Sequence, residues 1–236
     1  MDRCVIAGYR EIGKAVHSVL TTVHKTAVVD IDGKLHGNVQ EETRVDVLHI
    51  CFPYSDSFVH HVADYQARFN PEYTVIHSSV PVGTSSSCGA IHSPVVGTHP
   101  HLAKSLLTFT KFIGGDRASG VADHFRRAGI RVYITDRSES TELLKLDSTT
   151  WYGTCIEKTK DTKELFDEHG VPFELFTIWT DSYNRGYQAL GQPQFTRPNL
   201  TPIQGKIGGH CVLPNARLIG KTRFTEAILE RNQECE

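Results

Sequence analysis

Short apolar runs alternate with amphipathic segments through the first 137 residues, and this alternation is the strongest constraint on the fold. The runs predict six strands, at residues 3–7, 27–31, 45–52, 73–77, 108–113 and 131–135. Apolar residues at helical spacing predict helices between them, at residues 14–24, 55–69 and 117–128. Strands that alternate with helices in this way predict a doubly wound, parallel α/β sheet.

The pattern changes after residue 137. The next 32 or so residues contain no proline and enough apolar positions for one long helix. Further helices are predicted at residues 174–190 and 215–232, and the Pro- and Gly-rich segment 191–209 predicts a loop. We therefore expect an α/β domain at residues 1–137 and a helical domain at residues 138–236, which includes a cysteine-containing loop.

Composition excludes several classes of protein. A net charge of −2 gives no general attraction to nucleic acid or to anionic membranes. The chain contains no apolar stretch near the length of a membrane span, and it enters an apolar strand directly after its first residues, with no visible signal peptide. The six cysteines form no CxxC pair, which favours reduced thiols. We expect a cytoplasmic protein without a nucleic-acid or membrane partner.

A glycine-containing turn joins the first strand to the first helix. Gly8 is placed to make the tight turn, and Gly13 allows the helix to pack on the strand. Such a helix N-terminus faces a pyrophosphate, and an acidic residue about 20 positions further on accepts from a ribose hydroxyl. Asp30 suits that role better than Asp32, and its carboxylate would favour NAD over NADP by repelling a 2′-phosphate. The expected cofactor contacts are Gly8, Tyr9, Arg10, Ile12, Gly13, Asp30, Asp32 and Pro53.

One position of this turn departs from the dinucleotide pattern. Arg10 stands where a glycine normally lets the backbone approach the pyrophosphate. Its side chain would either clash with the dinucleotide or bind a phosphate through the guanidinium group. The alternative is a doubly wound domain that keeps the turn and no longer binds the dinucleotide.

Four further segments resemble one family, in order along the chain. They are Val28-Val29-Asp30-Ile31-Asp32, Ser78-Ser79-Val80-Pro81-Val82-Gly83-Thr84, Glu142-Leu143-Leu144-Lys145-Leu146 and Gly208-Gly209-His210-Cys211-Val212. Together with the glycine turn they resemble the UDP-glucose/GDP-mannose dehydrogenases. The resemblance implies a Rossmann-like domain followed by a helical dimerisation element. Members of that family are longer and carry a second α/β domain that helps to hold the nucleotide-sugar.

The resemblance also implies an NAD-dependent oxidation of an alcohol through a covalent thiol adduct. Cys211 would be the nucleophile, and Lys145 would stabilise developing oxyanion charge. Ser79 and Thr149 stand where the family has Thr and Asn, and Glu142 would be a neighbour of the site.

The residues themselves leave alternatives open. A Glu–Lys pair at helical spacing is also typical of a solvated surface ion pair. A thiol that follows Gly-Gly-His can be reactive, or can be packed and inert.

The segment between residues 91 and 101 departs from the family. Pro94 is followed by Val95, so the family's Pro-Glu carboxylate is missing, and His92, His99 and His101 occur instead. We expect His92 or His99 to act as a general base or to bind substrate, with hydrogen bonds to loop backbone as the alternative. Their spacing matches no established zinc signature, so no metal is expected.

These observations favour a nicotinamide-dependent oxidoreductase-like protein that acts on a small hydroxylated or nucleotide-sugar-derived substrate through one two-electron hydride transfer. The expected catalytic residues are Cys211, Lys145, Thr149, Ser79, His99 and His92. The alternatives are a non-catalytic nucleotide-binding or regulatory protein and a different enzyme, such as a transferase or a cyclising enzyme. A homodimer through the helix after residue 138 is also expected, with Leu143, Leu144, Trp151 and Tyr152 as its apolar patch.

Overall fold

A single mixed sheet organises the first part of the chain. The computed structural model describes residues 1–40 and 44–234. In this part of the chain eight strands lie in the order β3-β2-β1-β4-β5-β6-β7-β8. Their bounds are β1 Arg3–Ala7, β2 Lys25–Val29, β3 Leu35–Gly37, β4 Val47–Ile50, β5 Tyr73–Ile76, β6 Ile91–His92, β7 Lys111–Gly114 and β8 Val132–Thr135. Neighbouring strands are parallel, except that β3 is antiparallel to β2 and β7 to β6. The prediction of a doubly wound, Rossmann-like α/β fold is confirmed.

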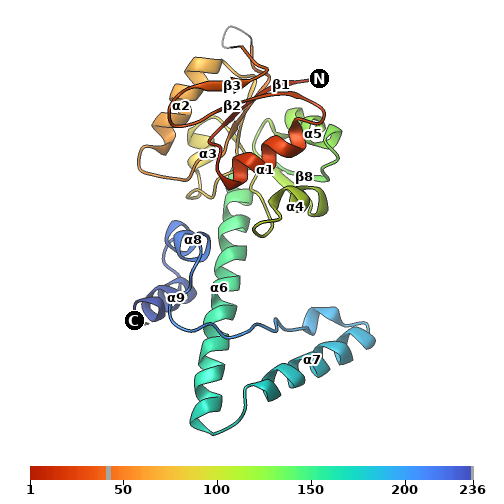
Figure 1. Ribbon diagram of the computed structural model, residues 1–236, viewed down its shortest axis with the longest axis vertical. Coiled ribbons are helices and arrows are strands. Elements are labelled where there is room, and N and C mark those ends of the chain that lie inside the picture. The colour runs from red at the N-terminus through yellow and green to blue at the C-terminus, as the bar shows by residue number, and fades with distance from the viewer. Residues whose placement is uncertain (41–43, 235–236) are drawn as a thin grey trace. The chain divides into compact units, whose positions relative to one another are not determined.

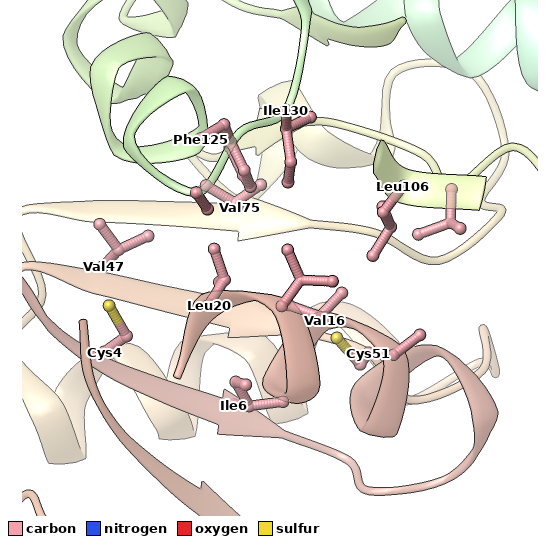
Figure 2. Close-up of a cluster of buried hydrophobic side chains, with 14 of the residues drawn as sticks. Cys4, Ile6, Val16, Leu20, Val47, Cys51, Val75, Leu106, Phe125 and Ile130 are labelled. Carbon is pink, nitrogen blue, oxygen red and sulfur yellow. The ribbon is translucent and has the colours of Figure 1, made fainter. Parts of the chain in front are cut away.

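Helices cover both faces of the sheet, which explains why the central strands are apolar at successive positions. One face carries α2 and α3, and the other carries α1, α4 and α5 (Figure 1). The bounds are α1 Glu11–Leu20, α2 Phe58–Phe69, α3 Thr84–Ser87, α4 Leu102–Thr108 and α5 Ala118–Arg127. Figure 2 shows the core beneath α1 and α5, where Leu20 and Phe125 point towards Ile6 and Val75 of the sheet.

Several short elements were not predicted. β3 has three residues and β6 has two, which is too short for a periodic pattern to form. The helices α3 and α4 are also short, and the turn at Gly83 and the His-Pro segment before α4 read as loop in the sequence. β7 and β8 run against β6, so the sheet is mostly rather than wholly parallel.

Contacts divide the chain into two compact units, residues 1–146 and 147–236. The division falls inside the long helix α6, Ser138–Glu168, which begins where the helical domain was predicted to start. The second unit also contains α7 Glu174–Ala189, the 3-10 turn η1 Pro193–Phe195, α8 Val212–Leu218 and α9 Arg223–Glu234. The single helix predicted at residues 215–232 is wrong, because Gly220, with φ +93°, separates α8 from α9.

Within the second unit, α8 and α9 pack on α6 through a small apolar cluster of Ile207, Val212 and Ile228. Gly153 of α6 permits this contact, since a Cβ there would lie 2.6 Å from Cγ1 of Val212. Arg231 of α9 adds ion pairs with Glu157 at 3.2 Å and Asp161 at 2.8 Å.

The described cysteines are free thiols, namely Cys4, Cys51, Cys88, Cys155 and Cys211, and Cys235 lies outside the described residues. Among the helices of residues 1–40 and 44–234, none has the length and apolar character needed to cross a membrane.

Candidate functional site

The carboxyl ends of β1, β4 and β5 meet at one edge of the sheet. The strand order reverses between β1 and β4, and ligands of open α/β sheets bind outside such a switch point. Gly8 follows β1 at this edge, and Pro53, which is exposed, follows β4. The predicted cofactor contacts therefore come to one edge from separate strands.

The glycine turn is held by a close backbone approach. Gly8 has φ +91°, and a Cβ there would lie 2.8 Å from the backbone nitrogen of Phe52. A Cβ on Gly13 would lie 1.9 Å from the carbonyl oxygen of Gly8. Both positions exclude any larger residue, so the first turn of α1 lies directly against the ends of β1 and β4. No described side chain caps the N-terminus of α1, whose free N–H groups suit an anion.

Asp30 ties the ends of β1 and β2 together. Its carboxylate accepts hydrogen bonds from the backbone N–H of Tyr9 at 2.9 Å and of Ile31 at 2.6 Å. A carboxylate has about four acceptor positions, so Asp30 retains capacity for a ribose hydroxyl. Asp32 instead caps a turn by accepting from the N–H of Lys34 at 3.1 Å. Asp30 is thus better placed than Asp32 for the predicted role.

The other residues of the turn differ in exposure. Arg10 is exposed at the N-cap of α1 and has an ordinary backbone conformation, with φ −84°. Its guanidinium group therefore has freedom to turn towards or away from a phosphate. Tyr9 is half-buried, with its hydroxyl 3.1 Å from Nδ1 of His17, while Ile12 packs against the core.

A feature that the sequence analysis missed lies at the N-terminus of α1. Glu11 pairs with His99, with 3.0 Å between Oε2 and Nε2, and both side chains are about half exposed. A carboxylate at this position opposes a bound pyrophosphate. His99 is thereby brought to the dinucleotide end of the site.

Glu142 is buried and holds the loop that carries Ser79. Its carboxylate accepts from the backbone N–H of Gly83 at 2.6 Å and of Ser85 at 2.7 Å. It is fully shielded from solvent, so it does not form the surface ion pair that its spacing from Lys145 also allowed. Glu142 positions the Ser-Val-Pro-Val-Gly-Thr loop at the end of β5, where Ser79 is half-buried.

Lys145 lies one turn further along α6. Its Nζ donates to the carbonyl oxygen of Val95 at 3.0 Å. Val95 belongs to the 93–101 loop, the segment of residues 93–101 between β6 and α4, and the same loop carries His99. One loop therefore contacts both Lys145 and, through His99, the N-terminus of α1.

His92 occupies a buried position behind this loop. Its Nε2 lies 3.2 Å from the carbonyl oxygen of Ser78, so it donates there, and its Nδ1 lies 2.8 Å from the hydroxyl of Thr141. Burial lowers the pKa of His92 to about 3, so the ring is neutral. This geometry suits the positioning of the residues before Ser79, and a general-base role remains a prediction.

The remaining predicted residues belong to the second unit. Cys211 is exposed at the N-terminus of α8, directly after His210, which is also exposed. Thr149 is half-buried on α6. Their roles in catalysis remain predictions.

Four histidines in the interior of the first unit form a buried histidine cluster that the sequence analysis did not identify. They are His24, His49, His77 and His124, each no more than 2% exposed. His49 and His77 occur within or directly after apolar strand segments, VDVLHICF and YTVIH, at positions that face the core. An imidazole at such a position is the signal that could have indicated the cluster.

Burial lowers the pKa of the histidines in the centre of this cluster. His49 and His77 are held well below 6.5, chiefly by desolvation. Desolvation also lowers the pKa of His124 to about 4, although the hydrogen bond to Asp2 opposes it. The buried Lys111 has its pKa lowered to about 7 for the same reason. The buried histidine cluster therefore contains three imidazoles that are neutral at pH 7.

Comparison with known proteins extends the fold assignment. No protein-family model matches the chain, and no curated protein sequence matches it significantly. Among solved structures, UDP-D-ManNAc dehydrogenase from Pyrococcus horikoshii aligns with a TM-score of 0.80 and 16% identity, over 98% of this chain and 68% of that chain. UDP-glucose dehydrogenase from Pyrobaculum islandicum aligns with a TM-score of 0.72 and 15% identity, over 99% of this chain and 68% of that chain.

A second kind of dehydrogenase is also similar. Mycobacterium tuberculosis 3-hydroxyisobutyrate dehydrogenase with L-serine aligns with a TM-score of 0.74 and 12% identity, over 99% of this chain and 93% of that chain. The chain therefore shares a Rossmann-like dehydrogenase fold with enzymes of both kinds. At these identities the likeness concerns the fold.

The buried imidazoles predict a loss of stability in mild acid. In the unfolded chain their pKa lies near 6.5, so below that pH the unfolded state binds more protons than the folded state. The contribution of these imidazoles to the free energy of unfolding should be fully retained above pH 6.5, and below it the free energy should fall by about 1.4 kcal/mol per pH unit for each neutral histidine.

Urea unfolding at a series of pH values between 6.5 and about 4 measures this slope. His49→Phe should reduce it, whereas His60→Phe, at an exposed position of α2, should leave it unchanged. A slope that is the same in both variants and in the wild type would contradict the account.

Proposed function

We propose that this chain is a nicotinamide-dependent dehydrogenase that transfers a hydride to or from a small hydroxylated substrate in one two-electron step. The observation that carries the proposal is the 93–101 loop, which contacts Lys145 at Val95 and the N-terminus of α1 at His99. A cationic side chain and a helix N-terminus open to anions thus lie along one edge of the sheet. Hydride transfer needs such an arrangement, with the coenzyme phosphates and the substrate oxygen held side by side.

The residues of the glycine turn fit a dinucleotide in most respects. The tight approach at Gly8 and Gly13, the uncapped helix N-terminus and the remaining acceptor capacity of Asp30 all favour it. The carboxylate of Asp30 favours NAD over NADP. When bound, the nicotinamide would accept or supply the hydride. Arg10 would add a phosphate contact and so offset the charge of Glu11.

The other groups of this edge act on the substrate. The Lys145 ammonium donates to the substrate oxygen and stabilises the charge that develops there as the hydroxyl proton leaves. Glu142 holds the Ser79 loop in place through two backbone N–H groups. Ser79 would bind the substrate, whereas Thr149 and Cys211 belong to the second unit and stay candidates there.

The substrate is proposed to be small. The family carboxylate is missing at Val95, which removes a group associated with the hydrolytic half of a four-electron oxidation. The fold also aligns over nearly the whole of a 3-hydroxyisobutyrate dehydrogenase. Both observations support a two-electron oxidation of a hydroxy acid or a similar compound. A non-catalytic binding protein is the main alternative, favoured by Glu11 and Arg10 at the phosphate position.

Turnover tests this proposal. NAD reduction with a panel of 3-hydroxy acids and nucleotide-sugars should show activity with at least one substrate, and Lys145→Met should lower kcat by roughly 10²–10³-fold. Lys104→Met, at an exposed lysine of α4, is the matched control and should retain activity. Tight coenzyme binding without turnover of any panel member would favour the binding protein.

We also propose that the chain forms a homodimer through α6. Leu143, Leu144, Trp151 and Tyr152 are about half exposed along this helix, although they are large and apolar. Light scattering at micromolar protein should give twice the 26.3 kDa chain mass, and Trp151→Glu should reduce it. A mass of one chain for the wild type would refute the dimer.

A further inference from the structure

A chain of hydrogen bonds crosses the first unit along the face of the sheet beneath α1 and α5. Nδ1 of His124 lies 2.8 Å from the carboxylate of Asp2, and its Nε2 lies 3.2 Å from Nε2 of His49. Nδ1 of His49 lies 3.0 Å from Nε2 of His77, and Nδ1 of His77 lies 3.2 Å from Nζ of Lys111. Each imidazole uses both of its ring nitrogens in this chain.

The chain joins opposite edges of the sheet. Asp2 directly precedes β1, at the amino edge, and its side chain is 19% exposed. Lys111 begins β7, which runs antiparallel to β6, so it lies beside the carboxyl end of β6. Its Nζ donates to the carbonyl oxygens of Ser93 at 2.8 Å and Pro94 at 3.2 Å, in the loop that also contacts Lys145. Lys111 itself is only 4% exposed.

One set of tautomers satisfies every bond of the path, although it leaves Nδ1 of His77 without a proton beside the carbonyl oxygen of Ser93, 2.8 Å away. An ammonium can only donate, so Lys111 donates to Nδ1 of His77. His77 must then donate from Nε2 to His49, His49 from Nε2 to His124, and His124 from Nδ1 to Asp2. All protons therefore point from Lys111 towards Asp2, and no ring needs a positive charge.

A second set of tautomers is also satisfied. It arises when Lys111 gives a proton to Nδ1 of His77. His77 then gives the proton on its Nε2 to His49, and His49 gives the proton on its Nε2 to His124. His124 finally gives the proton on its Nδ1 to Asp2, which becomes a carboxylic acid. The rings remain neutral, and the new N–H of His77 donates to the carbonyl oxygen of Ser93 at 2.8 Å. Lys111 becomes a neutral amine, and Asp2 then releases the proton to water. The bonds thus support two states that differ by one transferred proton.

We propose that Asp2, His124, His49, His77 and Lys111 form an imidazole relay, a proton-transfer path between solvent at the amino edge of the sheet and a buried amine at the carboxyl edge. Burying three imidazoles and an ammonium group costs free energy that apolar side chains would not cost, and the packing of the core does not require these polar groups. A pKa near 7 allows the Lys111 side chain to gain and lose a proton near neutral pH.

The surroundings of the relay contain few competing charges. Arg127 of α5 pairs with Asp2, and α1 and α4 present apolar side chains to Lys111, among them Leu20 and Leu106. The other titratable groups that face the relay are Cys4 on β1, His24 before β2, Cys51 after β4, His92 on β6 and Lys145 on α6. His24 stacks on His124 but bonds to its backbone carbonyl, outside the path.

A metal ion is the competing explanation for part of this cluster. The ligand atoms of Cys4, His49 and His124 all lie within 4.8 Å of one another, which suits a divalent cation such as zinc. The bond between Nε2 of His49 and Nε2 of His124 argues against it, because in either state one of these two nitrogens carries a proton and cannot bind a metal. The relay and the metal site therefore exclude each other.

The relay would serve the proposed dehydrogenase. Oxidation of a hydroxyl releases one proton at the edge that carries Lys145, and Lys111 contacts the adjacent residue of the same loop. This use rests on the proposed function, whereas the path itself does not. A test without coenzyme or substrate therefore separates the two.

Exchange of the Lys111 ammonium protons with water tests the relay. NMR on lysine-labelled protein measures the rate of this exchange in the wild type and in variants of the path. His49→Gln keeps hydrogen bonds to both neighbours but interrupts proton transfer, and it should slow the exchange by roughly tenfold or more. His24→Gln, which lies off the path, should leave the rate unchanged.

Each outcome decides the proposal. Destabilisation alone would speed exchange, so slowing in His49→Gln supports the relay. If that variant does not fold, Asp2→Asn at the half-buried entrance should give the same slowing. Equal rates in the wild type and in these variants would overturn the proposal. Stoichiometric zinc that is lost in His49→Gln would also overturn it.

Discussion

The contact between the backbones at Gly8 and Gly13 is the constraint on which the candidate site depends. Because neither position has room for a Cβ, α1 begins directly against the ends of β1 and β4. This approach places the helix N-terminus at the switch point of the sheet. Asp30 then fixes the turn by accepting from the N–H of Tyr9. A larger residue at either glycine would displace the turn and the helix together.

Buried polar groups hold the loop at the end of β5 that carries Ser79. Glu142 accepts two hydrogen bonds from backbone N–H groups of the Ser79 loop, and Nε2 of His92 donates to the carbonyl oxygen of Ser78, directly after β5. Groups of this kind contribute more to a unique geometry than to stability, since an apolar core of equal volume often stabilises as well. Their presence around one loop is therefore consistent with selection for a site rather than for packing.

The central strands were predicted from their short apolar runs, and α6 from a long segment that contains no proline and enough apolar positions. The glycine turn was also located, since it follows from local chemistry, and the cofactor role of Asp30 stays a prediction. The sequence could not predict β3, β6 or α4, which are too short to carry a period. The contacts of Glu11 with His99, and of His49 with His77 and His124, join residues far apart in the chain. Only the folded sheet brings such groups together, so no local sequence pattern indicates these contacts.

Affinity for NADH tests the central claim, that the Gly8 turn binds a dinucleotide at the switch point. A fluorescence titration should show saturable binding to the wild type. Glu11→Gln should bind several-fold more tightly, because a carboxylate at a helix N-terminus opposes the pyrophosphate by roughly 0.3–1 kcal/mol. Asp30→Ala should bind more weakly. The absence of saturable binding to both the wild type and Glu11→Gln at millimolar NADH would contradict the account.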